Sequence, residues 1–428
     1  MFVSIAADFN DRFLNVRKNM LVIWNTFASF QYKAVNTPDD RIISKPIEGS
    51  RENPTRQTLI QSIENSIRSY RYLLLPSTYK RRCKLLREHS VKPTDKPRVV
   101  IHSKGNRIDG PQGRRIYTLV VAFVRSGYEV TLVLDLRFVG NLFYKLKRLL
   151  LDEPISYAAR LEEITEPYLL VCDSPPRIIP DACRKLIEID YSHWIPDSDS
   201  LPLPFPMHPW IYHSRLDEKL GDYRRQTRKV RLFFMGDIAE KYSNHEVEDV
   251  YGKLPRDKIV ELLEQRLSEG TVRRVRSLEE WREVSETGFH GVVLGSTRDF
   301  QVPADEWLKA IASAEAFMVC PGVHYPMCHN AVESLAVGTV PLIEYPRNFH
   351  PVLEHDKNCL EFDGEEGLLS SVQKLLSMDA SELRAIGDRA TQYYNTHLTP
   401  QAFTRQIEEW PSEVCRLKVL AHQSEETR

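Results

Sequence analysis

The sequence predicts an α/β protein made of two Rossmann-like domains and a helical N-terminal extension. Two stretches carry this prediction, residues 98–134 and 316–345, because each runs from an apolar strand through a loop and a helix to a second strand. Strands that alternate with helices are typical of a parallel sheet covered by helices. The chain of 428 residues has room for two to three domains of about 150 residues each.

Residues 1–95 have a mostly helical pattern and are predicted to form the extension. Its second half is basic: the segment 51–100 holds twelve Lys or Arg residues against four Asp or Glu, with a cluster at 80–87. A helix face exposed to solvent explains such a cluster, and so does a patch that binds anionic lipid or a polyanion. The sequence supports both interpretations.

The first domain is predicted over residues 96–225. Its first strand, 98–102, leads through a glycine-containing loop into a helix at 114–126, whose apolar residues recur at i, i+3, i+4, i+7 and i+8. Gly127 is placed to end this helix, and a strand follows at 129–134. We therefore expect an amphipathic helix that packs one face on the sheet.

Two more strands of this domain are predicted at 168–172 and 186–189. Each is followed by an aspartate, Asp173 and Asp190, which would lie on the ligand side of an open sheet. The segment 191–213 is rich in proline and aromatic residues without any period, so we expect an irregular loop near the ligand.

A second domain is predicted over residues 226–398, with 214–229 as the connector. The strand and helices expected ahead of its central loop are 230–235, 255–268 and 303–313. Asp379 and Glu382 form a capping-box pattern at the start of a later helix. A Thr-Pro pair opens the segment 399–428, which is predicted to form a C-terminal helix that crosses back to the first domain.

The most informative loop lies within the segment 316–345. A Pro-Gly pair ends a short strand, a helix follows at 328–337, and Gly338 stands where a C′ glycine belongs. The free N–H groups at the N-terminus of this helix offer a site for an anion such as a diphosphate. Asn330 and Glu333 are expected on the face opposite the apolar residues, where the carboxylate could accept hydrogen bonds from a ribose.

The CPG motif, a following proline, the N-x-x-E pair and the run GTVPLI resemble the nucleotide-sugar half of glycosyltransferases of the GT-B fold. Both the glycogen-synthase-like group (family 4, group 1) and the exostosin-like group (family 47) have such a loop, helix and strand. The first unit, which ends in RSGYEVTLV, resembles the acceptor domain of the former group. The resemblance implies two domains that face a cleft and a transfer reaction that needs no metal.

The resemblance also implies roles for particular residues. The donor would be held by residues of both domains: Gly110, Gly113, Gly236, Lys241, Gly322, His324, Tyr325, Pro326, Asn330 and Glu333. An inverting enzyme needs a base for the acceptor hydroxyl. The candidates in the first domain are His102, Asp109, Asp173 and His193. No cofactor is implied, because the nucleotide-diphosphate sugar is a co-substrate.

Two positions depart from the glycogen-synthase-like pattern. That group has an arginine just after the glycine of the second domain's first strand, where this chain has Asp237. It also has two glutamates eight positions apart, and Tyr325 replaces the first of them here. The exostosin-like group does not require that glutamate. Because one group retains the anomeric configuration and the other inverts it, both stereochemical outcomes stay open.

Composition excludes several classes of function. A net charge of −1 gives no field that favours nucleic acid. The seven cysteines form no C-x-x-C pair, so we expect free thiols in a reducing compartment. No transmembrane run or signal peptide is evident, which makes a cytoplasmic location the expectation. The glycines of the first loop do not meet the dinucleotide-binding spacing, and the Cys and His residues at 320–329 match no common zinc motif.

A basic amphipathic helix is predicted at 141–151. Such a helix in the first domain, together with the cluster at 80–87, could give peripheral contact with a membrane that carries a lipid-linked acceptor. The alternative is a packed helix with a basic edge in solvent.

We therefore expect a glycosyltransferase that acts on a glycan or lipid-linked acceptor in surface polysaccharide or glycoconjugate synthesis. A non-catalytic GT-B protein that binds a sugar nucleotide or glycan is one alternative, supported by the two departures at Asp237 and Tyr325. A sugar-nucleotide 2-epimerase of the same fold is another, and it would require additional acid/base carboxylates and a histidine at the sugar.

Overall fold

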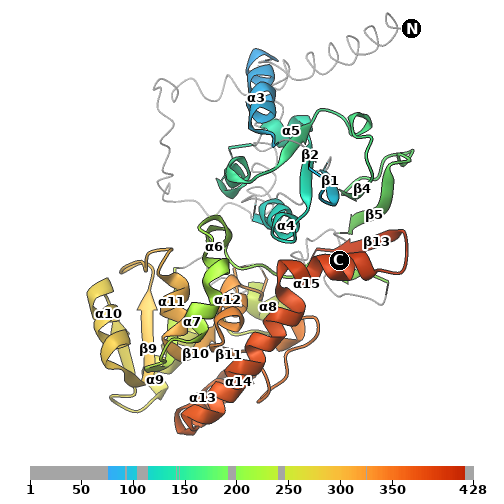
Figure 1. Cartoon of the computed structure of the whole chain (residues 1–428). Coiled ribbons are helices and arrows are strands. Elements are labelled where there is room, and N and C mark those ends of the chain that lie inside the picture. The colour runs from blue at the N-terminus through green and yellow to red at the C-terminus, as the bar shows by residue number, and fades with distance from the viewer. Residues whose placement is uncertain are drawn as a thin grey trace, which may run out of the picture. The chain divides into compact units, whose positions relative to one another are not determined.

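The computed structural model describes residues 76–91, 94–103, 114–140, 142–143, 145–190, 199–239, 246–323 and 325–419. All of them belong to one compact unit, residues 61–428. Two parallel sheets form its framework, one of seven strands and one of six (Figure 1). The predicted α/β fold with two Rossmann-like domains is confirmed. Most of the predicted extension, 1–95, lies outside the described residues.

The first sheet has the strand order β3 (Ser156–Ala158), β2 (Glu129–Val133), β1 (Arg98–His102), β4 (Tyr168–Cys172), β5 (Cys183–Asp190), β13 (Val414–Lys418), β6 (Leu201–Pro202). Its first five strands follow the order of a doubly wound sheet, in which β1 lies between β2 and β4. The strand β13 from the end of the chain pairs with β5 on one side and β6 on the other.

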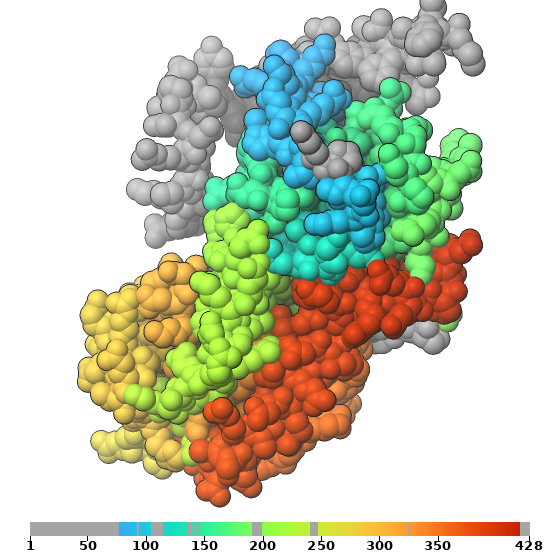
Figure 2. Space-filling model, in the orientation of Figure 1, coloured from blue at the N-terminus to red at the C-terminus, as the bar shows by residue number. Residues whose placement is uncertain are grey.

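Helix α4 (Arg114–Arg125) covers this sheet with six buried side chains, among them Ile116 and Phe123. Helix α15 (Pro400–Glu409) packs on α4, where the rings of Phe123 and Phe403 meet edge to face at 6.1 Å. The two helices lie against each other in the space-filling view (Figure 2). The C-terminal segment thus contributes both a helix and a strand to the first domain.

The second sheet has the order β12 (Leu360–Glu361), β11 (Val340–Ile343), β10 (Ala314–Val319), β7 (Val230–Gly236), β9 (Phe289–Ser296), β8 (Val272–Val275). Every residue of β7 is buried. Leu232 and Phe234 pack into one apolar cluster, and Phe233 and Met235 pack into another. Alternate side chains therefore point to opposite faces, and both faces are covered, as expected for a central parallel strand.

The helices of the second domain are α8 (Glu246–Tyr251), α9 (Arg256–Arg266), α10 (Leu278–Thr287), α11 (Trp307–Ala312), α12 (His329–Val337), α13 (Gly364–Ser377) and α14 (Ala380–Tyr393). The capping box predicted at Asp379 and Glu382 is present, with both of its hydrogen bonds. Gly338 ends α12 in the left-handed conformation, with φ of 73°. Both local predictions are confirmed.

The segment that follows the first domain is more regular than predicted. It contains α6 (Pro209–His213), a 3₁₀ turn (Leu216–Lys219) and α7 (Leu220–Arg224), where an irregular loop and a connector were expected. His208 begins α6 because its side chain accepts a hydrogen bond from the Trp210 N–H, and Pro209 suits the first helical position. A histidine cap is a weaker sequence signal than Ser, Thr, Asp or Asn, which is why this helix was missed.

The basic amphipathic helix predicted at 141–151 is wrong in two respects. The backbone forms a 3₁₀ helix over Lys145–Asp152. Lys147, expected on a basic face, is completely buried, and its ammonium group lies 4.2 Å from the centre of the Phe138 ring. The face of the Phe138 ring therefore receives this cation through a cation–π contact.

Within the described part of the chain, no helix is long and apolar enough to cross a membrane. All seven cysteines are free.

Candidate functional site

The second sheet reverses its strand order at β7, which has β9 on one side and β10 on the other. In open α/β sheets, ligands bind outside the carboxyl ends of the strands at such a reversal. Two loops meet at this place: one begins at Asp237 after β7, and the other begins at Cys320 after β10 and leads to α12. The predicted donor residues Gly236 and Gly322 stand at the starts of these loops.

Arg256, the first residue of α9, joins the two loops. Its guanidinium donates to the backbone oxygens of Asp237 at 3.0 Å and of Pro321 at 2.9 Å, and its side chain is buried. A Cβ on Gly236 would stand 3.3 Å from Nη1 of Arg256 and 3.0 Å from the Phe234 ring, so glycine permits this approach. Sequence reasoning missed Arg256. Its two partners lie 19 and 65 positions away along the chain, so no local sequence signal links them to it.

The loop after β10 is a tight turn. Gly322 donates its N–H to the Pro326 oxygen at 3.1 Å, and a Cβ at Gly322 would stand 2.5 Å from the Tyr325 oxygen. Tyr325 is buried, with its hydroxyl accepting from Asn348 Nδ2 at 3.1 Å. Burial raises the pKa of Tyr325 to about 12, so the hydroxyl stays protonated. Tyr325 and Pro326 therefore shape the loop, and the donor-binding roles predicted for them stay predictions.

Glu333 is buried, with 1% of its surface exposed. One carboxylate oxygen accepts from the His208 backbone N–H at 2.9 Å, and the other accepts from Trp307 Nε1 at 2.7 Å. Burial raises the pKa of this carboxyl, and the two hydrogen bonds oppose that shift. Trp307 and the His208 segment therefore cover this helix face at Glu333. Its role at a ribose stays a prediction, and Asn330 is half-buried beside it.

His329 opens α12 and faces His208, with ring centres 5.3 Å apart. Its Nδ1 lies 2.8 Å from the Pro206 carbonyl oxygen, which can only accept, so Nδ1 carries the proton and Nε2 is an acceptor. Nε2 has no hydrogen-bond partner among the residues that the structure describes. Burial, reinforced by Arg114, lowers the pKa of His329 and brings that of His208 to about 4. Both rings are therefore neutral at pH 7.

Two arginines at the start of α4 bring positive charge from the first domain to this place. The charge of Arg114 acts on His208, His329 and Glu333 and lowers the pKa of each. The charge of Arg115 acts likewise on Tyr325. The start of the helix that follows the predicted glycine loop of the first domain thus lies within electrostatic reach of the N-terminus of α12. Sequence analysis named that loop and missed both arginines.

Several predicted site residues lie outside the described part of the chain. They are Asp109, Gly110, Gly113, His193, Lys241 and His324.

The first sheet brings two of the candidate bases to neighbouring strand ends. His102 is the last residue of β1 and stands in register with Cys172 of β4, directly before Asp173. Ser103 Oγ donates to Asp173 Oδ2 at 2.8 Å, which fixes that carboxylate. Because β1 and β4 are the strands at which this sheet reverses, both residues lie where a ligand of the first domain is expected. Their role as a base stays a prediction.

No three His, Cys, Asp or Glu side chains within the described ranges come together in a way that could hold a metal ion.

The chain matches no protein-family model and no curated protein. Among solved structures, it is similar to the N-terminal domain of trehalose-6-phosphate phosphatase from Candida albicans, with 11% identity, a TM-score of 0.38, and coverage of 74% of this chain and 97% of that one. It is similar to Alr3699/HepE from Anabaena in complex with UDP and glucose, with 12% identity, a TM-score of 0.36, and coverage of 73% and 98%.

A third similar structure is sucrose-phosphate synthase from Thermosynechococcus elongatus, with 13% identity, a TM-score of 0.34, and coverage of 73% of this chain and 98% of that one. At identities and TM-scores as low as these, the likenesses carry no argument about the activity of this chain.

Proposed function

We propose that this chain is a GT-B glycosyltransferase that moves a sugar from a nucleotide-diphosphate sugar to a glycan or lipid-linked acceptor. The surface polysaccharides and glycoconjugates of a cell are the products we expect. The observation that carries the proposal is that the charge of Arg114 acts on His329, the first residue of α12, at the reversal point of the second sheet. The charge of Arg114 and the positive end of the α12 dipole would then both favour an anion at this place.

The proposed chemistry needs stabilisation of a diphosphate leaving group as its negative charge grows. The N-terminal N–H groups of α12 and the guanidinium of Arg114 can supply it without a metal. Arg256 would act as a positioning residue, because it holds the two loops at one separation. Nε2 of the neutral His329 would accept a hydrogen bond from a ligand hydroxyl. His102 or Asp173 would serve an acceptor in the first domain.

The burial of Glu333 supports a second candidate function, a GT-B protein that binds a sugar nucleotide without turning it over. Both carboxylate oxygens already accept hydrogen bonds from the protein, and the position of the first family glutamate holds the buried Tyr325. A binding protein needs the anion site and does not need a carboxylate at the sugar.

Thermal shift with UDP, GDP, ADP, dTDP and CMP tests both candidates. A ligand that binds only the folded chain stabilises it by about 2.7 kcal/mol at a hundred times its dissociation constant. We expect one nucleoside diphosphate to raise the melting temperature of the wild type, and Arg114→Gln to lose most of that shift. Arg276→Gln is the matched control, since Arg276 is exposed at the start of α10.

The outcomes separate the proposals. If no nucleotide raises the melting temperature at millimolar concentration, both proposals fail. If one does and Arg114→Gln and Arg276→Gln respond equally, the anion site is wrongly placed. Once a nucleotide is identified, release of that nucleotide from its sugar conjugate, on addition of an acceptor or water, supports the transferase. Binding without any release supports the non-catalytic protein.

A further inference from the structure

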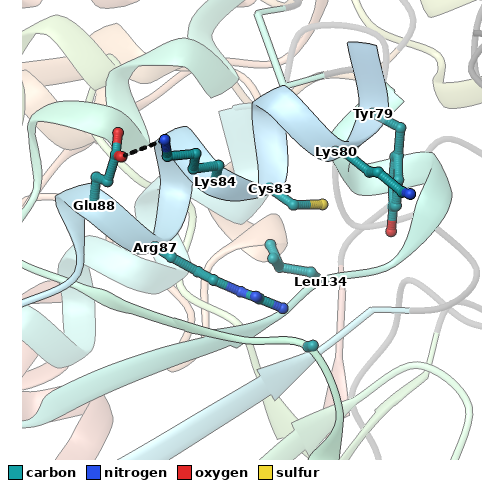
Figure 3. Close-up of a pocket in the computed structure, with 8 residues that line it drawn as sticks. Tyr79, Lys80, Cys83, Lys84, Arg87, Glu88 and Leu134 are labelled. Carbon is teal, nitrogen blue, oxygen red and sulfur yellow. Dashed lines mark ion pairs between the residues drawn. The ribbon is translucent and has the colours of Figure 1, made fainter. Parts of the chain in front are cut away.

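A cavity of about 620 Å³ lies between α3 (Pro76–His89) and the carboxyl ends of two strands of the first sheet. Leu134, just after β2, faces α3 across it (Figure 3), and Ala159, just after β3, also lines it. Its size is that of a small-molecule site, roughly 300 to 1,000 Å³. The cavity lies on the edge of the sheet formed by the carboxyl ends of its parallel strands, at β2 and β3, beside the reversal point at β1 and β4.

One face of α3 lines the cavity and is basic. Its lining residues form two neighbouring rows, each with a spacing of four, so that they share one side of the helix: Tyr79, Cys83 and Arg87, and Lys80, Lys84 and Glu88. Lys84 lies 3.7 Å from Glu88, which neutralises that pair. Lys80 and Arg87 form no ion pair with any residue that the structure describes. Within the described residues, Lys80 and Arg87 therefore bring two positive charges to the cavity that no ion pair neutralises, and the nearby carboxylate of Asp135 acts on Tyr79.

The directions of the side chains also separate the Lys84–Glu88 ion pair from Lys80 and Arg87. In Figure 3 the side chains of Lys80 and Arg87 extend to the same side of α3 as Cys83 and Leu134, whereas Lys84 turns toward Glu88. Tyr79 lies beside Lys80 and adds a hydroxyl. Burial is the main reason why the pKa of Tyr79 is raised to about 12, so that the hydroxyl remains a donor at neutral pH.

The other basic residues of this cluster are used differently. Arg82 donates to the Val139 and Gly140 oxygens at 3.2 and 3.3 Å and covers the Phe143 ring at 4.7 Å, so it anchors α3 on the domain. Arg81 is exposed and does not line the cavity. The cluster is therefore not a uniform basic face, because only part of it surrounds the cavity.

We propose that this cavity binds a phosphate-bearing ligand, with Arg87 and Lys80 on either side of the phosphate and the Tyr79 hydroxyl as a further donor. A phosphate offers several strong acceptor oxygens and at least one negative charge, which match a guanidinium, an ammonium and a hydroxyl. The phosphate can belong to a soluble phosphorylated sugar or to a lipid headgroup, and the chemistry of recognition is the same. The site is distinct from the one at α12, and it does not depend on the proposed activity.

Cys83 provides a local readout, because its sulfur lines the cavity. The full chain is treated with iodoacetamide, with and without inorganic pyrophosphate, and the alkylation rate of each cysteine is followed by mass spectrometry. At ten times the dissociation constant, the unoccupied fraction falls to about one eleventh, so alkylation of Cys83 should slow by about tenfold. Cys183, half-buried in β5 and outside the cavity, is the internal control and should not change.

The double variant Lys80→Gln/Arg87→Gln should need at least about tenfold more pyrophosphate for the same protection, since hydrogen bonds to charged groups are lost. Arg81→Gln is the matched control and should behave as the wild type. Both variants replace exposed side chains, and such changes rarely unfold a protein. Pyrophosphate bound only at α12 would leave Cys83 unprotected, so failure of this proposal is distinguishable from failure of the other.

Two further probes identify the source of the phosphate. Protection of Cys83 by glucose 1-phosphate supports a soluble ligand. Binding to phosphatidylcholine vesicles only when they contain phosphatidic acid, and its loss in Lys80→Gln/Arg87→Gln, supports a lipid headgroup. The proposal is overturned if none of the three probes protects Cys83, if Cys183 is protected equally, or if the double variant is protected as well as the wild type.

Discussion

At the scale of the residue, Glu333 illustrates how far a helical pattern reaches. Apolar spacing identifies the side of α12 that packs on the sheet, and it places Glu333 on the other side. Trp307 and His208 cover that other side, and they lie 26 and 125 positions from Glu333 along the chain. No local pattern links these three residues, so the two protein donors that hold this carboxylate could not be predicted from the sequence.

His208 should make the folded chain sensitive to acid. Its pKa is about 4 in the folded chain against an ordinary value of 6.5, so the unfolded chain binds the proton first as the pH falls. The stabilising contribution of the neutral ring is complete above pH 6.5 and is lost progressively toward pH 4. Between pH 7 and pH 5 the loss from this group is about 2 kcal/mol.

His208→Asn tests this expectation, because asparagine can still cap α6 and cannot be protonated in this range. Urea unfolding at pH 7 and pH 5 should show a decline about 2 kcal/mol smaller in the variant than in the wild type. Other titrating groups are common to both proteins and cancel in the comparison. Equal declines would mean that His208 is as easily protonated in the folded chain as in the unfolded one.

At the scale of the element, the sequence predicted helix ends best, because the capping residue and the group that it caps lie within one helical turn. The capping box at Asp379 and Glu382 joins residues three positions apart, and the glycine after α12 acts on the helix that precedes it. The basic helix at 141–151 failed because its conformation depends on the neighbours that bury Lys147. Local signals determine caps and ends, whereas packing selects among helix types.

Gly338 and Gly127 both follow a helix, and together they allow a measurement of how much stability is lost when such a glycine gains a side chain. Both have positive φ, 73° and 83°. Gly338→Ala would place a Cβ 2.7 Å from Thr391 Oγ1, whereas Gly127→Ala would meet nothing within 4 Å. We expect a loss of about 1 kcal/mol for Gly127→Ala from the backbone alone. Gly338→Ala should cost about 1 to 3 kcal/mol more, from crowding.

Urea denaturation of the two alanine variants measures both costs. A Gly338→Ala protein no less stable than Gly127→Ala would show that Thr391 moves aside freely, and that the close approach of α14 to α12 adds nothing to stability.

At the scale of the whole molecule, the chain returns to its first domain to complete it. The strand β13 lies between β5 and β6. At the end of α15, the backbone oxygens of Ile407, Glu408 and Trp410 accept hydrogen bonds from the Lys185 ammonium group of β5. A strand at 414–418 was not predicted, because it has only five residues, one of them the buried Lys418, and so shows no clear apolar alternation. Its place in the sheet is set by contacts more than 200 residues away in sequence.

Truncation tests the importance of this return. A chain that ends at residue 412 lacks β13, and it leaves an edge of β5 with unpaired backbone groups. We expect it to melt at a lower temperature than the full chain and to aggregate on heating. A chain that ends at Val419 keeps β13 and should melt like the full chain. Equal melting of the two truncated chains would show that β13 contributes little to the first domain.

The sequence by itself determined the α/β class, the two domains, the strand ends that carry His102 and Asp173, and the caps of α12 and α14. Each follows from periodicity or from residues a few positions apart, which is the range over which backbone hydrogen bonding acts. Only the tertiary structure decided that Arg256 joins two loops, that the charge of Arg114 acts on His329, and that α3 lines a basic cavity. Those contacts join residues remote in sequence, and they form because burial of apolar faces brings the elements together.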